Sequence, residues 1–200
     1  MDLLAHWIGN IPDFAVPFAL AALGLIISER AGVLTLGAEG LMLVGALAGI
    51  GAVLAVHEPG IGLIAGMLAA AAVSLLFAVM VVWLRVNQVI AGLALVFFCQ
   101  GLTGLLGTVL GWTNQPVPGP EAVPLGPLAA LPLVGGLFRQ NLAVYLVPFI
   151  FAGVVGWLHH TASGLRLRAV GENPQAADAA GVPVLRLRFL AIVAGAALIG

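Results

Sequence analysis

The residues best suited to covalent chemistry are His159, His160 and Ser163, because histidine beside serine is the pairing that activates a hydroxyl nucleophile. The serine stands in the sequence TASG, which lacks the GxSxG turn of hydrolases. Neither HxxxH nor CxxC occurs, so metal-ligand spacing is missing, and the absence of lysine rules out a Walker A loop. We therefore predict no catalytic residue, no metal ligand and no ATP-binding loop in this chain.

Gln100 and Thr103 are polar residues inside a long apolar stretch, and helical spacing places them on one face together with Gly104 and Gly107. Polar side chains in a spanning helix must face protein or water. Uncharged amides and hydroxyls suit a path for polyhydroxylated solutes. The alternative is that the two side chains form hydrogen bonds between helices.

Glu39 follows the segment Ala31–Gly37, AGVLTLG, which is too apolar for a free loop and too short to span a membrane. Broken helices of this kind expose backbone groups near substrate paths in transporters. The segment therefore predicts a broken helix, and Glu39 is a candidate for the translocation path. The alternative places Glu39 at the headgroup level, either solvated or paired with Arg30.

The only long polar run is Gly164–Arg188, which holds four of the seven arginines. Asn173 is a good N-cap, and Pro174 suits the first helical position. Gly181 suits the left-handed position after a helix end, and Pro183 prevents continuation. These residues predict a helix of about two turns, too short to persist without a docking surface. The alternative is a solvated connection with well-capped ends.

The polar run also carries a family resemblance. Its stretch GENPQAADAAGVPVLRLRFL resembles the cytoplasmic coupling loop of ATP-binding-cassette importer permeases, which serve simple sugars, nucleosides and branched-chain amino acids. Ser28–Met42, SERAGVLTLGAEGLM, resembles the second signature of the branch for nucleosides and simple sugars, although that branch usually shows Asn where this chain has Thr35. The two signatures lie far apart and in the expected order.

The resemblance implies a permease subunit that translocates nucleosides or simple sugars. ATP and Mg²⁺ would bind a separate ATPase subunit and no cofactor would bind this chain, while a second permease chain and an extracytoplasmic solute-binding protein would complete the importer. The coupling loop would lie within residues 161–188, and Ala177 in mid-helix would enter a cleft of the ATPase. The coupling residues implied are Gly171, Glu172, Asn173, Pro174, Ala176, Ala177 and Gly181.

Composition places the chain in a membrane. It is 62% hydrophobic and 8% charged with a mean hydropathy of +1.18, whereas soluble domains carry about 25% charged residues. We predict an all-α polytopic transmembrane bundle forming one domain over residues 1–200, and we expect that the C-terminal helices of the domain are missing from this chain. About six spans are predicted: Ile11–Ser28, Ala38–Val56, Gly60–Leu84, Val86–Gly111, Leu142–His160 and the beginning of one at Phe189–Gly200.

Arginine placement predicts the orientation. If the run Gly164–Arg188 is cytoplasmic, Arg30 and Arg85 are also inside, and only Arg139 lies outside with the N-terminus. We expect a multi-pass protein of the bacterial inner membrane. The proline-rich connection Trp112–Gln140 would be external, and its apolar part Leu125–Leu137 would lie on the membrane surface or dip into the protein.

Close helix packing is predicted by three GxxxG pairs, Gly45–Gly49, Gly62–Gly66 and Gly107–Gly111. Nucleic-acid binding is not expected, because no basic patch exists outside the polar run. Two alternative functions stay open, a branched-chain amino acid permease and an ion-coupled secondary transporter. The third to fifth predicted spans contain no Asp, Glu, Lys or Arg, which argues against proton coupling.

Overall fold

The computed structural model describes residues 2–112, 115–116, 119, 122–124 and 135–200. Helices make up most of these ranges, and a small two-stranded sheet accounts for the rest of the regular structure. The elements in chain order are α1 (Asp2–Arg30), α2 (Ala38–Val56), α3 (Pro59–Ala78), the π-helix η1 (Val79–Trp83), α4 (Gln88–Val109), β1 (Ala122–Pro124), the 3₁₀-helix η3 (Gly135–Phe138), β2 (Arg139–Asn141), α5 (Leu142–His160), α6 (Ala162–Glu172), α7 (Pro174–Ala179) and α8 (Val184–Ile199).

The predicted all-α, polytopic bundle is confirmed. Within the described residues, five helical segments are long and apolar enough to cross a membrane, and they match the first five predicted spans: Gly9–Arg30, Ala38–Val56, Pro59–Trp83, Gln88–Val109 and Leu142–His160. The spans could be predicted from the apolar runs, because a single apolar segment can satisfy all its backbone hydrogen bonds inside a bilayer only as a helix. The chain is a multi-pass membrane protein.

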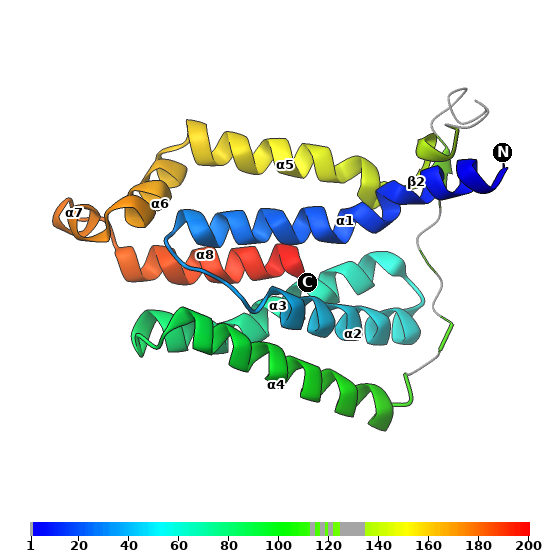
Figure 1. Cartoon of the computed structure of the whole chain (residues 1–200), viewed down its shortest axis with the longest axis horizontal. Coiled ribbons are helices and arrows are strands. Elements are labelled where there is room, and N and C mark those ends of the chain that lie inside the picture. Colours follow the sequence, from blue (N-terminus) through cyan, green and yellow to red (C-terminus); the bar gives the residue numbers. More distant parts are fainter. Residues whose placement is uncertain (1, 113–114, 117–118, 120–121, 125–134) are drawn as a thin grey trace.

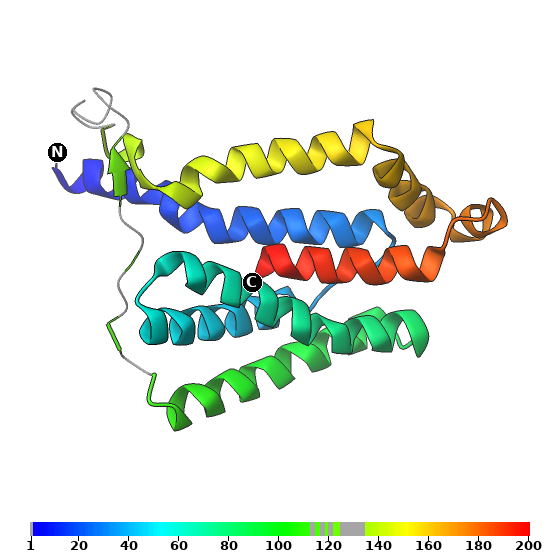
Figure 2. The same cartoon turned by 180° about the vertical axis from the view of Figure 1, so that it is seen from behind.

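The helices lie roughly side by side (Figure 1). Helix α8 packs between α1 and α3, while α2 packs against both α3 and α4. Helix α5 lies at the far side of α1, and the view from behind shows the same order (Figure 2). The core forms where these helices meet, and its largest fully buried side chains include Phe77, Leu23, Leu41 and Ile192.

Glycines set the closest helix contacts, as two of the three GxxxG pairs predicted. A Cβ added to Gly49 on α2 would lie 3.2 Å from the carbonyl oxygen of Gly62 on α3. A Cβ added to Gly24 on α1 would collide with the carbonyl oxygen of Gly195 on α8. The third pair was misread, because Gly111 follows the end of α4 and has open space around it.

Two ends of the bundle differ in their elements. The ends of α1 and η1 lie at one end together with α6 and α7, whereas β2 and the first turns of α1 lie at the other (Figure 1). Arg30 ends α1 and Arg85 follows η1, so both share an end with the arginines of α6, while Arg139 in β2 lies at the opposite end. This grouping is the one on which the predicted orientation depends.

The sheet ties the connection between α4 and α5 to α1. Strands β1 and β2 pair antiparallel. The buried Gln140 side chain donates from Nε2 to the carbonyl oxygens of Gly9 and Gly136, at 2.6 Å each, and Asn141 donates to the Asp13 carboxylate at 2.8 Å. No pattern in the sequence predicts this sheet. For the predicted surface segment Leu125–Leu137, residues 125–134 lie outside the described residues.

Two predictions about the polar run need correction. The segment 161–188 is not a loop, because α6, α7 and the beginning of α8 occupy most of it. Helix α8 begins at Val184, well before the predicted start of the last span at Phe189. Low hydropathy hid α6 and the first turn of α8, although Leu167 and Val170 of α6 have the spacing of one helix face and are both buried.

Candidate functional site

Helix α7 has the caps that its sequence predicts. The Asn173 side chain accepts a hydrogen bond from the backbone N–H of Ala176 at 3.0 Å, and Pro174 occupies the first position. At the other end, Gly181 adopts a φ of +79°, and its N–H donates to the carbonyl of Asp178 at 2.9 Å. The N–H of Val182 donates to the carbonyl of Ala177, which completes a Schellman motif.

One expectation about α7 is wrong. Ala177 is only 5% exposed, because this side of α7 packs on the chain itself, where α6 and α8 contact the helix. Its side chain therefore cannot enter a cleft of another subunit. The exposed surface of α7, called here the α7 outer face, consists of Gln175, Ala176, Asp178 and Ala179.

Ser163 and His159 form local hydrogen bonds near the start of α6. Thr161 caps α6 by accepting from the N–H of Gly164 at 3.1 Å. Ser163 accepts from Trp157 Nε1 at 2.9 Å, and His159 Nδ1 lies 3.0 Å from the carbonyl of Val155. No hydrogen bond in the described part of the chain joins either neighbouring histidine to Ser163, so the arrangement is not a nucleophile with its base.

The chain between α1 and α2 breaks at the predicted place. Helix α1 ends at Arg30 and α2 begins at Ala38, so residues 31–37 form an unwound strap. Alternate residues point inward: Val33 and Thr35 are buried, whereas Leu34 and Leu36 are exposed. The Leu34 N–H donates to Gln88 Oε1 at 2.7 Å, so Gln88 supplies the acceptor that a helix would otherwise provide.

Helix α2 consequently begins partway along the bundle (Figure 1). A Cβ added to Gly37 would lie 2.8 Å from Leu95, and one added to Gly40 would lie 3.0 Å from Val96 and from Cys99. The first turn of α2 is thus level with the second and third turns of α4. Glu39 in that turn is exposed, in the position where a carboxylate is stabilised by the helix dipole.

Glu39 and Gln100 border the same side of the α2–α4 contact. The two helices run in the same direction, and Gly40 packs on α4 between Val96 and Cys99. On α2, Glu39 is rotated about 100° around the helix axis from the contact at Gly40, and on α4, Gln100 is rotated about 90° from the contact centre in the opposite sense. Because the two helices are parallel and face each other, rotations of opposite sense bring both side chains to the same side of the helix pair. Both residues are exposed.

Thr103 lies at the edge of this side and is half-buried. Its hydroxyl is 2.7 Å from the carbonyl oxygen of Cys99 and 3.2 Å from that of Gln100, so its proton stays within α4. The hydroxyl oxygen can still accept. We call Glu39, Gln100 and Thr103 the α2–α4 polar face. Within the part of the chain that the structure describes, the side chains of Glu39 and Gln100 form no hydrogen bond or ion pair, and Thr103 forms no hydrogen bond to another helix.

Sequence reasoning missed the residues that hold the strap. Gly171 on α6 lies against the end of α1, where a Cβ would collide with the Arg30 carbonyl oxygen. Arg188 on α8 donates from Nε to the carbonyl oxygen of Ala31 at 3.2 Å. The glycine was assigned only to the coupling loop, and the arginine was used only for orientation. A contact between segments so far apart in sequence leaves no local signal.

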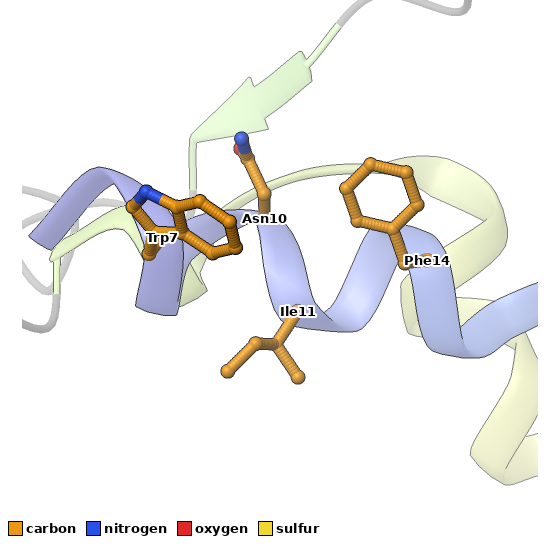
Figure 3. Close-up of a pocket in the computed structure, with 4 residues that line it drawn as sticks. All are labelled: Trp7, Asn10, Ile11 and Phe14. Carbon is orange, nitrogen blue, oxygen red and sulfur yellow. The ribbon is translucent and has the colours of Figure 1, made fainter. Parts of the chain in front are cut away.

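A pocket on the N-terminal half of α1 has a different character. Trp7, Asn10, Ile11 and Phe14 line it, with Ile11 projecting to the side opposite Asn10 and Phe14 (Figure 3). Trp7 and Phe14 are 71% and 72% exposed. Exposed aromatic residues at a helix end are typical of the membrane–water boundary, so these residues suit lipid contact. Metal-binding groups of three or more His, Cys, Asp or Glu are absent from the described ranges.

Sequence comparison finds one family and several relatives that this chain resembles. A family described as "Branched-chain amino acid transport system / permease component" matches residues 8–200. A Haloferax volcanii protein with the provisional name of glucose ABC transporter permease is 39% identical, over 100% of this chain and 62% of its own length. A guanosine ABC transporter permease of Bacillus subtilis is 31% identical, over 90% of the chain and 60% of the relative.

A third relative, a nucleoside ABC transporter permease of Lactococcus lactis, is 28% identical over 93% of the chain and 62% of its own length. The chain therefore spans about three fifths of the length of these relatives. No solved structure matches it.

Proposed function

Because the chain belongs to the family of permease components of branched-chain amino acid transport systems, we propose that it is the membrane-spanning permease subunit of an ATP-binding-cassette importer for simple sugars or nucleosides. The subunit itself carries out no chemical reaction. ATP with Mg²⁺ binds and is hydrolysed on a separate ATPase subunit, and this chain binds no cofactor.

The observation that carries the proposal is α7. A helix of six residues is too short to be stable alone, yet it is capped at both ends and held on the chain by Ala177. Helix α7 lies beyond the ends of the spanning helices (Figure 1). A short, rigid, small-residue helix at the membrane surface suits insertion into a cleft of an ATPase subunit, and closure of the ATPase pair would displace it.

The substrate class follows from the relatives and the polar face. Relatives at 39%, 31% and 28% identity are named for glucose, guanosine and nucleoside transport. Sugars and nucleosides share hydroxyl groups, which donate to a carboxylate such as Glu39 and exchange hydrogen bonds with an amide such as Gln100. The α2–α4 polar face then lines the path between this subunit and a second permease chain.

The remaining partners and the orientation complete the proposal. A solute-binding protein delivers substrate at the end formed by β2 and the start of α1, which is external. The end with α6 and α7 is cytoplasmic, as the arginine distribution favours. The membrane is the cell membrane of a prokaryote, with the N-terminus outside.

A branched-chain amino acid is the second candidate substrate, because the family description names that transport system. An amino acid carries a carboxylate and an ammonium group, so it needs a cation and an anion in its site. The α2–α4 polar face offers one carboxylate and no cation, which favours the uncharged hydroxylated solutes.

The test is ATP-driven uptake into proteoliposomes that contain this permease, its ATPase and its second permease subunit, with the solute-binding protein added outside. We expect accumulation of a labelled sugar or nucleoside that requires ATP, and no accumulation of leucine. Uptake driven by a sodium or proton gradient without the ATPase would contradict the proposal. ATP-driven uptake of leucine alone would retain the permease and reject the substrate class.

A further inference from the structure

The end of α1 is closed by residues from two other helices. Its own backbone forms a Schellman motif, in which Gly32 donates to the carbonyl of Glu29 at 2.9 Å and Val33 donates to that of Ser28 at 3.1 Å. The carbonyl of Ala31 has no partner within this motif. Arg188 of α8 supplies one through Nε at 3.2 Å, and its positive charge lies at the negative end of the α1 dipole.

Helix α6 contacts the same turn through Gly171. A Cβ there would collide with the carbonyl oxygen of Arg30 and would lie 3.0 Å from its carbonyl carbon and 3.2 Å from the nitrogen of Gly32. Gly32 has a φ of +78°, and a Cβ on it would lie 3.3 Å from the Cα of Gly171 and 3.2 Å from a terminal nitrogen of Arg188. Three helices therefore meet at one turn with no room for an added methyl group.

The two helices that contact this turn are the two that flank α7. Helix α6 ends at Glu172, directly after Gly171, and only Asn173 separates it from α7. Helix α8 begins at Val184, within two helical turns of Arg188. Any displacement of α7 is therefore applied to Gly171 from one side and to Arg188 from the other.

The strap leads from this turn to the polar face. Leu34 is bonded to Gln88 at the start of α4. Gly37 packs on α4, where its Cβ would lie 3.6 Å from the carbonyl oxygen of Gly92. Helix α2 begins at the next residue, and Glu39 lies in its first turn. A shift of the strap thus changes where α2 begins and where Glu39 stands.

We propose that Arg188 and Gly171 are positioning residues that transmit the displacement of α7 to the strap and through it to Glu39. This inference rests on the proposed function, because it needs an ATPase that moves α7. Arg188 acts by holding the Ala31 carbonyl, and Gly171 acts by letting the α6 backbone press directly on the α1 turn. Both residues act through the turn at the end of α1.

The experiment measures solute transported per ATP hydrolysed by the complete transporter in proteoliposomes. Arg188→Met keeps the length of the side chain and removes its donors. Arg186→Met is the matched control, because Arg186 is exposed on the same helix. Gly171→Ala tests the second contact, and Gly153→Ala on α5 is its control, because a Cβ at Gly153 meets nothing within 4 Å.

We expect Arg188→Met to lower the transport-to-hydrolysis ratio about fivefold or more, since couplings between sites are typically of that size. ATPase co-purification and basal hydrolysis should be retained, and Arg188→Lys should restore part of the ratio because it retains the charge and a donor. Gly171→Ala should act in the same direction, and both controls should behave as wild type.

A wild-type ratio in Arg188→Met would overturn the inference, as would an equal loss in Arg186→Met. If Gly171→Ala does not assemble, the Arg188 variants decide alone. Failure of the proposed function looks different, because the unmodified transporter would then show no ATP-dependent uptake, whereas failure of this inference leaves that uptake intact and insensitive to Arg188→Met.

Discussion

The turn at the end of α1 is closely packed, whereas the α2–α4 polar face is exposed. At the turn, backbones touch through Gly171 and Gly32, and a charged side chain is committed to a carbonyl. At the polar face, Glu39 and Gln100 are exposed, and a Cβ on the nearby Gly104 would meet nothing within 4 Å. Tight packing transmits a displacement, so the turn is suited to mechanical coupling. An open polar surface can exchange hydrogen-bond partners, so the α2–α4 polar face is suited to contact with a solute.

The largest expected effect comes from adding bulk to a tight glycine contact and to an open one. Gly24→Val should destabilise the protein by about 1–3 kcal/mol, because its side chain has no space against Gly195. Gly104→Val should change stability by less than about 0.5 kcal/mol, since open surface tolerates substitution. Thermal unfolding of both variants in the same detergent measures the difference. Equal melting temperatures would show that the tight α1–α8 contact at Gly24 tolerates added bulk as well as the open surface at Gly104 does.

The next effect concerns the two sides of α7. Ala176→Trp enlarges the α7 outer face, and we expect ATPase binding to weaken about tenfold or more, as for a central interface residue. Ala177→Trp should instead force α7 away from α6 and α8, because Ala177 is buried there. Co-purification measures the first effect, and proteolysis near Gly181 measures the second. Wild-type ATPase binding by Ala176→Trp would show that α7 is only a connection.

A smaller effect is expected at the polar face. Gln100→Leu should lower kcat/KM for uptake about tenfold, which corresponds to roughly one lost hydrogen bond to the solute. Assembly and basal ATP hydrolysis should be unchanged. Leu105→Ala is the control, since Leu105 is exposed on the opposite side of α4. A misassembled complex in Gln100→Leu would support a packing role for this amide.

The smallest effect is expected at Thr35. Its hydroxyl oxygen is buried and has no hydrogen-bond partner among the described residues. Removing an unsatisfied buried hydroxyl without changing the shape of the side chain is neutral or stabilising. Thr35→Val should therefore raise stability by up to about 1 kcal/mol with transport retained. A clear loss of stability would show that the hydroxyl has a partner in the assembled protein.

Features governed by neighbouring residues could be predicted from the sequence. The caps of α7 depend on Asn173, Pro174 and Gly181 alone, and the five spans depend on runs of apolar residues. The break before α2 was also visible, because Ala31–Gly37 was too apolar for a loop and too short to span. In each case the local sequence determines the structure.

Features that depend on distant neighbours could not be predicted. Ala177 and Ala176 are identical side chains one residue apart, and only the packing of α6 and α8 decides which is buried. Gly171 resembles the other glycines of the chain until α1 is placed beside it. Helix α6 was overlooked because its polar residues outweighed the buried spacing of Leu167 and Val170.

The most direct test of the account is cross-linking of α7 to the ATPase subunit in a chain without Cys99. A reagent-bearing cysteine is introduced by Ala179→Cys on the α7 outer face or by Ala177→Cys on its buried side. We predict that Ala179→Cys cross-links to the ATPase, that ATP changes the yield, and that Ala177→Cys gives little product. Absence of an ATPase cross-link from Ala179→Cys in an assembled, transporting complex would contradict the account.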